Sequence, residues 1–118
     1  MDYPTTIPIA YRKNGRIVGL IVGIPIEKFD GDETFPDPDI NKRNTVYTVV
    51  IQYDDPSVAK VLEKEYLAYL KRYNIKNESR HMRCDWVKGS GFKKMKNISE
   101  WKVEGFDICY CKREISGV

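Results

Sequence analysis

The sequence predicts an α+β fold, in which a small mixed or antiparallel β-sheet of about five strands carries one long amphipathic helix on one face. Several short runs are rich in β-branched and aromatic residues and are bounded by turn residues. One segment in the middle of the chain has the helical period of 3.6 residues. Strand runs lie on both sides of that single helix instead of alternating with helices, which favours a mixed or antiparallel sheet over a parallel one.

The first element predicted is an N-terminal hairpin. Thr6–Arg12 and Arg16–Ile24 are both β-prone, and Lys13, Asn14 and Gly15 lie between them. Asn-Gly accepts the positive φ angles of a type I′ turn, so this dipeptide predicts a tight turn between two antiparallel strands. Glycines also recur in the second strand, and there they predict bulges or close backbone packing.

A long acidic loop is expected next, over residues 27–44. This segment contains six acidic residues, two prolines and no hydrophobic period. Such a length is unusual for a compact domain, so we expect a loop that is functional or mobile, with solvated carboxylates and no calcium site. The run Thr45–Tyr53 follows and predicts a buried, central strand.

The predicted helix begins after Asp55 and ends near Tyr73. Asp55 is suited to cap the first turn, Pro56 costs nothing at the first helical position, and Asn74 accepts the left-handed conformation that ends helices. The apolar stripe of this helix comprises Val58, Leu62, Tyr66, Tyr69 and Tyr73, with Val61 and Leu70 on its flanks. The opposite face mixes lysine and glutamate, so we expect the helix to dock on the sheet and not on a membrane.

Two further strands are predicted after the helix. Arg80–Val87 is the first and Phe106–Arg113 the second. The glycine-rich residues 89–91 end the first of these strands. Residues 92–101 have no clear period, and residues 99–101 are left open as a helical turn or the start of a strand.

Composition and cysteine count restrict the class of protein. At 118 residues we expect one domain covering residues 1–118. The hydrophobic fraction is 42 % and the charged fraction 31 %, which excludes a disordered chain and a membrane protein. Three cysteines, an odd number, argue against a secreted disulfide scaffold, and Cys84, Cys109 and Cys111 are expected to be packing residues. With no signal peptide apparent, we expect a cytoplasmic protein; abundant Lys, Glu and Ile with few Gln is typical of a thermophilic source.

Charge is divided unevenly along the chain. Residues 1–70 hold 8 basic and 11 acidic residues, whereas residues 71–118 hold 12 basic and 6 acidic residues. Aromatic residues alternate with the cations in the basic half, and this combination offers contacts to phosphates and stacking surfaces to bases. The alternative, also left open, is that the two halves form salt bridges with each other and leave no basic patch.

The sequence analysis therefore favours a small non-enzymatic protein that binds nucleic acid or another polyanion through its C-terminal half. The expected contacts are Arg72, Arg83, Lys88, Lys93, Lys94, Lys96, Trp86, Phe92 and Tyr110. We expect no catalytic residue, no metal and no cofactor, and a homodimer is left open. The alternative hypothesis is a protein–protein interaction or inhibitory factor of the kind that viruses and mobile elements encode.

One resemblance to a family of enzymes rests on two short motifs. His81-Met82-Arg83 is half of a His-hydrophobic-His pair, and Tyr110-Cys111-Lys112 places a tyrosine close before a lysine. Together they resemble the motifs of replication initiators that nick single-stranded DNA. The resemblance implies a metal held near His81 and a nucleophilic Tyr110, although Arg83 stands where that family has its second imidazole.

Overall fold

One six-stranded sheet and one helix make up the molecule in the computed structural model, which describes residues 5–115, without the side chains of residues 99 and 100. The elements are β1 (Ile7–Lys13), β2 (Arg16–Pro25), the 3₁₀ turn η1 (Ile26–Phe29), β3 (Thr45–Tyr53), α1 (Pro56–Arg72), β4 (Asn77–Arg83), the 3₁₀ turn η2 (Cys84–Trp86), β5 (Lys93–Val103) and β6 (Phe106–Glu114). The predicted α+β class is confirmed, with six strands where about five were expected.

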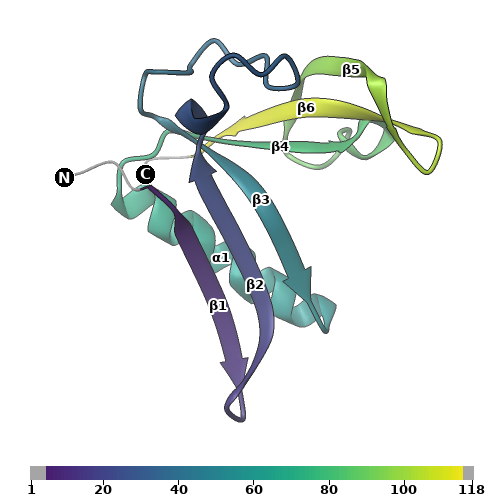
Figure 1. The fold of residues 1–118 in the computed structure, drawn as a ribbon. Coiled ribbons are helices and arrows are strands. Elements are labelled where there is room, and N and C mark those ends of the chain that lie inside the picture. Colours follow the sequence, from purple (N-terminus) through teal and green to yellow (C-terminus); the bar gives the residue numbers. More distant parts are fainter. Residues whose placement is uncertain (1–4, 116–118) are drawn as a thin grey trace.

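The sheet consists of two antiparallel halves joined by a short parallel contact. Its strand order is β1-β2-β3-β4-β6-β5, and only β3 and β4 run parallel. Figure 1 shows β1, β2 and β3 side by side with α1 across one face, and β4, β6 and β5 extending away from them in another direction. The chain passes from β3 through α1 to β4, and β3 and β4 are parallel, because parallel neighbours need a long crossover connection of this kind.

The N-terminal hairpin forms as predicted. Asn14 has φ 53° and Gly15 has φ 76°, which are the positive values of the predicted turn. In β2, a Cβ atom at Gly19 would lie 2.6 Å from Leu62 and one at Gly23 would lie 2.2 Å from the Tyr66 hydroxyl. The predicted close packing at the β2 backbone is thus confirmed, and the side chains that approach it belong to α1.

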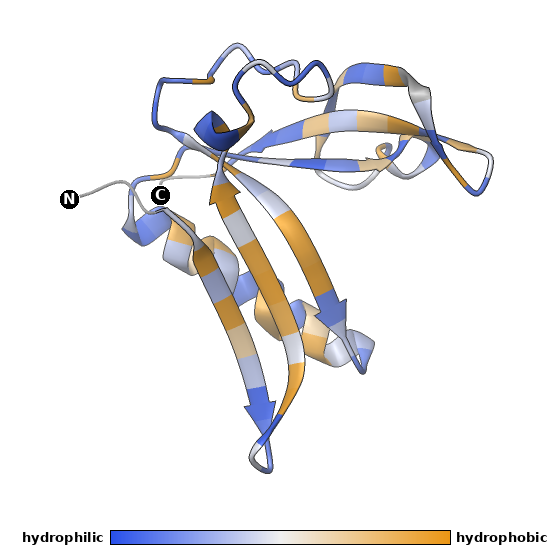
Figure 2. Ribbon diagram, in the orientation of Figure 1, coloured by the Kyte–Doolittle hydropathy of each residue, from blue (hydrophilic) through white to orange (hydrophobic). Residues whose placement is uncertain are grey.

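The helix α1 also begins and ends where the sequence predicts. The Asp55 carboxylate accepts from the Ser57 backbone N–H at 2.8 Å, and Asn74 has φ 59°. Its packing face differs from the predicted stripe in one respect: Leu62, Tyr66 and Leu70 are buried, whereas Val61 is exposed. Leu70 therefore belongs to the centre of the face. Figure 2 shows the apolar residues of β1, β2 and β3 that this helix covers.

The limits of one strand were predicted incorrectly, and most of another strand was not predicted. β4 starts three residues before Arg80 and ends at Arg83, because Cys84 begins the η2 turn. β5 spans eleven residues, of which only residues 99–101 were left open as the start of a strand. It is an edge strand with a register shift on each side of Asn97, so it has neither the apolar alternation nor the regular period by which strands are recognised.

The segment between β2 and β3 is folded against the sheet and is not a solvated loop. Phe35 and Asp37 are buried, and Phe35 stacks on Phe29 with ring centroids 4.0 Å apart. Asp37 accepts from Tyr110 at 2.5 Å and from Lys112 at 2.7 Å. The expectation that these carboxylates are solvated is therefore wrong for Asp37, since a buried carboxylate must be paired.

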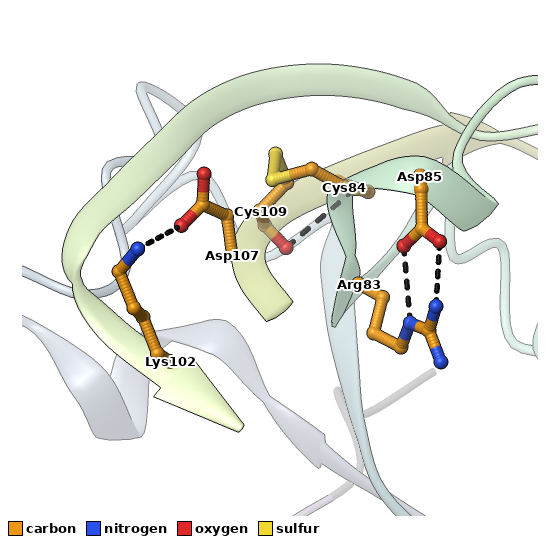
Figure 3. Close-up of a disulfide and its surroundings, with 7 residues drawn as sticks. Arg83, Cys84, Asp85, Lys102, Asp107 and Cys109 are labelled. Atoms are coloured by element: carbon orange, nitrogen blue, oxygen red, sulfur yellow. Dashed lines mark hydrogen bonds and ion pairs between the residues drawn. A yellow bond between two sulfur atoms is a disulfide. The ribbon is translucent and has the colours of Figure 1, made fainter. Parts of the chain in front are cut away.

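Two of the three cysteines form a disulfide, which corrects the expectation that all three only fill space. Cys84 of η2 is bonded to Cys109 of β6, and Cys111 is free and buried. Figure 3 shows the bond beside the Arg83–Asp85 ion pair and near the Lys102–Asp107 pair. The odd number of cysteines leaves one thiol unpaired, as the sequence indicates, but it does not prevent the other two cysteines from forming a disulfide.

Among the described residues, no helix has both the length and the apolar character needed to cross a membrane.

Candidate functional site

The candidate site lies where β3 and β4 separate. The two strands pair over only three positions, from Thr45 with Asn77 to Tyr47 with Ser79. Beyond that point β3 carries a bulge, because Val22 of β2 pairs with Val50 and Gly23 pairs with Thr48, so Val49 is an extra residue. Bulges bend a strand and are frequent beside active sites. The result is a splay whose β3 edge has no strand partner on the β4 side among the described residues.

A tyrosine and the chain's one histidine meet across the start of this splay. The Tyr47 hydroxyl of β3 lies 2.7 Å from His81 Nδ1 of β4, and His81 Nε2 lies 2.5 Å from the Thr34 carbonyl oxygen. A carbonyl only accepts hydrogen bonds, so Nε2 carries the ring proton. In the neutral imidazole Nδ1 is then an acceptor, and it receives the Tyr47 hydroxyl proton. The two hydrogen bonds therefore fix both the tautomer and the ring orientation.

The surroundings keep this pair in its neutral form. Desolvation lowers the pKa of His81 below its ordinary value of 6.5, opposed in part by the Thr34 carbonyl and the charge of Asp32. Burial raises the pKa of Tyr47 to about 12. The rings that pack around His81 are those of Phe35, Tyr47, Trp101 and Tyr110. At pH 7 the site thus holds a neutral imidazole and a protonated phenol.

A cleft of about 430 Å³ lies beside the splay, between α1, β4 and the segment after η2. Its lining residues are Ile51, Glu63, Arg80, His81, Met82, Trp86, Ser90, Phe92 and Arg113. The lining includes large apolar side chains and three charged ones, Glu63, Arg80 and Arg113. A volume of this size is within the range of sites for small molecules.

The charged residues of the cleft neutralise one another. Glu78, whose side chain is fully buried, binds Arg80 at 2.5 Å and Arg113 at 2.6 Å. Glu63 of α1 binds the same two arginines at 2.9 and 3.2 Å. The two guanidinium groups also lie over the Phe92 ring, at 5.0 and 4.5 Å from its centroid. Two cations and two anions thus form one compensated network in the cleft.

A chain of hydroxyl groups links this network to the helix. The Thr48 hydroxyl donates to Glu78 at 2.5 Å, so its oxygen accepts from Tyr66 at 3.0 Å. Desolvation raises the pKa of Tyr66 well above its ordinary value. The buried Glu78 carboxylate is therefore satisfied by three partners, Thr48 and the two arginines, and β3, β4, β6 and α1 are tied together at one point.

Most of the cations that the sequence groups as a basic surface lie at exposed positions. Arg72 is exposed at the end of α1, and Lys88, Lys93, Lys94 and Lys96 are exposed around and along β5. Arg83 is paired with Asp85 and lies between the rings of Trp86 and Phe106, at 4.4 and 3.3 Å from their centroids.

Salt bridges between the two halves of the chain are present, as the alternative reading of the charge division allowed. Lys112 pairs with Asp37 and Asp39, and Arg80 and Arg113 pair with Glu63. Three cations of the basic half are therefore neutralised internally, and the excess of positive charge counted along the sequence overstates the charge on the surface.

Tyr110 cannot act as a surface nucleophile. It lies within β6 opposite His81, is fully buried and donates to Asp37. Burial raises the pKa of Tyr110 far above its ordinary value. Its neighbour in the strand pairing, His81, is occupied on both ring nitrogens. In the part of the chain that the structure describes, no group of three or more His, Cys, Asp or Glu side chains is placed to hold a metal ion.

Most of the residues at the splay could not be recognised from the sequence. Tyr47, Glu78 and Arg80 carry no motif, and Arg113 appeared only as one cation among many. The available signal was Thr45–Tyr53 followed directly by a capped helix, which is a parallel crossover from β3 to β4. Ligands of open sheets bind beside such crossovers, but the sequence does not say which strand comes next to β3.

The fold is shared with solved structures of acyl-transferring enzymes. The sequence matches no protein-family profile and no curated protein. The CoA-dependent acyl-homoserine lactone synthase BjaI, solved with SAM and isopentyl-CoA, superposes with a TM-score of 0.69 at 16 % identity over 94 % of this chain, which spans 59 % of that protein. An Escherichia coli N-acetyltransferase of ribosomal protein S18 alanine gives a TM-score of 0.65 at 10 % identity, over 94 % of this chain and 70 % of that one.

A third neighbour comes from Desulfovibrio desulfuricans and is assigned to the GNAT family of acetyltransferases. It has a TM-score of 0.68 at 10 % identity, over 95 % of this chain and 70 % of its own. Identities this low show a common fold and no more. The fold nevertheless overturns the hypothesis of a small non-enzymatic nucleic-acid-binding or accessory protein, because the fold neighbours are acyltransferases. The chain therefore has a GNAT-like fold, and it spans little more than half of the lactone synthase.

Proposed function

We propose that this chain is an enzyme that transfers an acyl group from a thioester to an amine. The observation that carries the proposal is the Tyr47–His81 hydrogen bond, which joins β3 and β4 at the start of the splay. The fold neighbours suggest the reaction class, since they include a CoA-dependent acyl-homoserine lactone synthase and an N-acetyltransferase. Such a reaction needs one group to take a proton from the attacking amine and to return it to the leaving thiolate.

The Tyr47–His81 pair has the geometry for this proton transfer. As the amine nitrogen attacks the thioester carbonyl carbon, the Tyr47 oxygen accepts the amine proton and its own proton passes to His81 Nδ1. The C–N bond forms, the C–S bond breaks, and the proton returns through Tyr47 to the thiolate, so that amide and thiol leave. The transient imidazolium keeps its Nε2 hydrogen bond to Thr34, which favours the charged form.

The splay supplies a place for the donor. Past Tyr47 the β3 edge offers backbone groups that no strand of residues 5–115 pairs with on the β4 side. An extended, amide-containing arm adds to such an edge as another strand does. The apolar parts of the arm would lie in the cleft beside this edge and be excluded from water there. The lining of the cleft includes Ile51, Met82 and Phe92.

The test is thiol release from an acyl thioester in the presence of an amine. The probes are S-acetylpantetheine and acetyl-CoA, with spermine and a lysine-containing peptide as acceptors. We expect release above the uncatalysed rate, and Tyr47→Phe and His81→Gln to reduce it by about 10²–10⁴-fold, the usual contribution of general acid–base catalysis. No release above background with any of these pairs would overturn the proposal.

Tyr73→Phe is the matched control. Tyr73 stacks on Tyr69 of α1, 4.6 Å between ring centroids, and takes no part in the splay. The variant loses a tyrosine hydroxyl as Tyr47→Phe does, but at a position outside the splay, so we expect wild-type rates. Equal rates for Tyr47→Phe and Tyr73→Phe would remove Tyr47 from the mechanism, whereas circular dichroism of each variant separates loss of chemistry from loss of fold.

A further inference from the structure

We propose that the acyl donor of this cleft has an uncharged thiol arm, such as pantetheine, and that the diphosphate of a CoA nucleotide is not bound. This inference rests on the proposed acyl transfer and specifies its donor. The lactone synthase that shares the fold was solved with isopentyl-CoA, so CoA is the donor that the fold suggests. Whether the residues here fit CoA is decided at the open end of the splay, where β3 ends and α1 begins.

The N-terminus of α1 does not fit a diphosphate. A helix N-terminus binds phosphate when its free N–H groups and its partial positive charge face the ligand. Here the first helical residue is Pro56, which has no N–H, and the Ser57 N–H is bonded to the Asp55 carboxylate at 2.8 Å. The Val58 N–H is bonded to the Asp55 carbonyl at 2.9 Å. The donors of the first turn are therefore already used.

Charge at this end of the splay also opposes a diphosphate. Asp54 and Asp55 are adjacent, and hydrogen bonds from Ser57 lower the pKa of Asp55, so its carboxylate stays ionised. Arg16 is paired with Asp54 at 3.4 Å, and it belongs to β2, on the side of β3 away from β4. A diphosphate placed here would meet two exposed carboxylates, and the two cations nearby, Arg16 and Lys13, already face those carboxylates.

Deeper in the cleft the cations are not free for phosphate either. Arg80 and Arg113 each bind both Glu63 and Glu78, and the network carries no net charge. An anion would have to displace Glu63 from both arginines. The cleft therefore suits a neutral arm, whose amides pair with the β3 edge and whose methylene groups contact Met82 and Phe92.

The experiment compares pantetheine with CoA in binding and in rate. Calorimetric titration gives the Kd of each thiol, and thiol release gives kcat/KM for S-acetylpantetheine and acetyl-CoA. We expect the two donors to agree within about threefold, or the pantetheine donor to be better. CoA binding ten or more times tighter than pantetheine would overturn the inference and leave the proposed acyl transfer standing. Failure of both thiols to bind or react would overturn the two together.

A single substitution isolates the charge at the helix. Asp55→Ser keeps a side chain that caps the helix and removes the carboxylate, so the fold is retained. We expect it to shift the Kd ratio towards CoA by about 2- to 5-fold, the size of one charge at a helix N-terminus, and the shift should shrink in 0.5 M salt. Glu65→Gln removes an equal charge from an exposed position farther along α1 and should leave the ratio unchanged. Equal ratios for both variants would contradict the role of Asp55.

Discussion

His81 gives the folded state a pH dependence that can be assigned to one side chain, because the chain has a single histidine. Burial lowers its pKa in the native state below the 6.5 of an exposed imidazole. The unfolded chain therefore binds a proton at a higher pH than the native chain does, and stability falls as the pH drops below about 6.5. Above that pH neither state is protonated and the contribution is constant.

The first prediction is that thermal denaturation between pH 7.5 and 5 shows a falling Tm with its onset near pH 6.5. The reference pKa values of aspartate and glutamate, about 3.9 and 4.3, lie below this window. The variant His81→Gln should be less stable at pH 7.5 but nearly flat across the same range. A slope that survives in the variant would show that another group carries the pH dependence.

Gly23 of β2 leaves no room for a side chain. A Cβ there would lie 2.2 Å from the Tyr66 hydroxyl and 2.7 Å from Val46. We predict that Gly23→Ala destabilises the protein by about 1–3 kcal/mol in urea denaturation, as overpacked cores do. The double variant with Tyr66→Phe lacks the nearest atom. Its loss in free energy of unfolding should therefore be smaller than the sum of the losses in the two single variants. Simple additivity would show that the clash is relieved elsewhere.

At the scale of elements, α1 is held by its buried face. Leu62 is 1 % exposed in a core cluster that includes Ile21, Tyr66 and Leu70, whereas Lys64 is exposed. We predict that Leu62→Ala lowers the free energy of unfolding by about 2–5 kcal/mol and that Lys64→Ala changes it by no more than about 0.5 kcal/mol. Similar losses at the two positions would be incompatible with this helix face.

The segment between β2 and β3 is held by one buried carboxylate. Asp37 accepts from Lys112 and Tyr110, and the side chains of Asp37 and Lys112 are 0 % and 10 % exposed. Removing one partner leaves the other charge buried, so Asp37→Ala should cost about 3–5 kcal/mol. The control is Lys42→Ala, which removes an exposed lysine from its pair with Asp39 and should cost at most about 1 kcal/mol, because Asp39 keeps its pair with Lys112.

Hydrogen exchange separates a local effect from a global one. We expect the Asp37→Ala variant to lose protection in residues 26–44 before the strands β1 and β2 do, because the segment is attached through Asp37. A uniform loss over the whole sheet would mean that the carboxylate supports the core and not the segment alone.

For the whole molecule, the Cys84–Cys109 disulfide closes a loop over 25 positions that contains η2 and β5. By the chain-entropy account a crosslink over a loop of this length contributes about 3–4 kcal/mol. We predict that a reductant lowers the urea midpoint accordingly. The variant with Cys84→Ser and Cys109→Ser should resemble the reduced protein and be insensitive to reductant. Unchanged midpoints with and without reductant would argue that the bond contributes nothing.

The crosslink also bears on the cleft, since Trp86 and Phe92, two of its lining residues, lie in the segment that the disulfide closes. Met82 and Phe92 of the cleft also pack in the cluster that contains Cys84 and Cys109, so the disulfide is in contact with one side of the candidate site.

Local features of this protein could be read from the sequence because their causes are local. The turn at Asn14 and Gly15 follows from backbone conformations that few residues tolerate, and the helix start at Asp55 and Pro56 follows from hydrogen bonds within one turn. The class of fold followed as well, because it depends on the kinds of elements and their order. β5 escaped prediction because its described side chains other than Ile98 are exposed on both faces, so no apolar alternation marks it, and two register shifts interrupt its pairing with β6.

What the sequence left undetermined is every contact that depends on which strands are neighbours. The pairing of Lys112 with Asp37, of Arg80 with Glu63 and of Cys84 with Cys109 joins residues 17 to 75 positions apart. Because β6 lies between β4 and β5, it brings Arg113 to Glu78 and covers Tyr110. Tyr47 and His81 meet for the same reason: the crossover through α1 sets β4 beside β3, and tertiary packing alone brings a tyrosine hydroxyl to an imidazole 34 residues away.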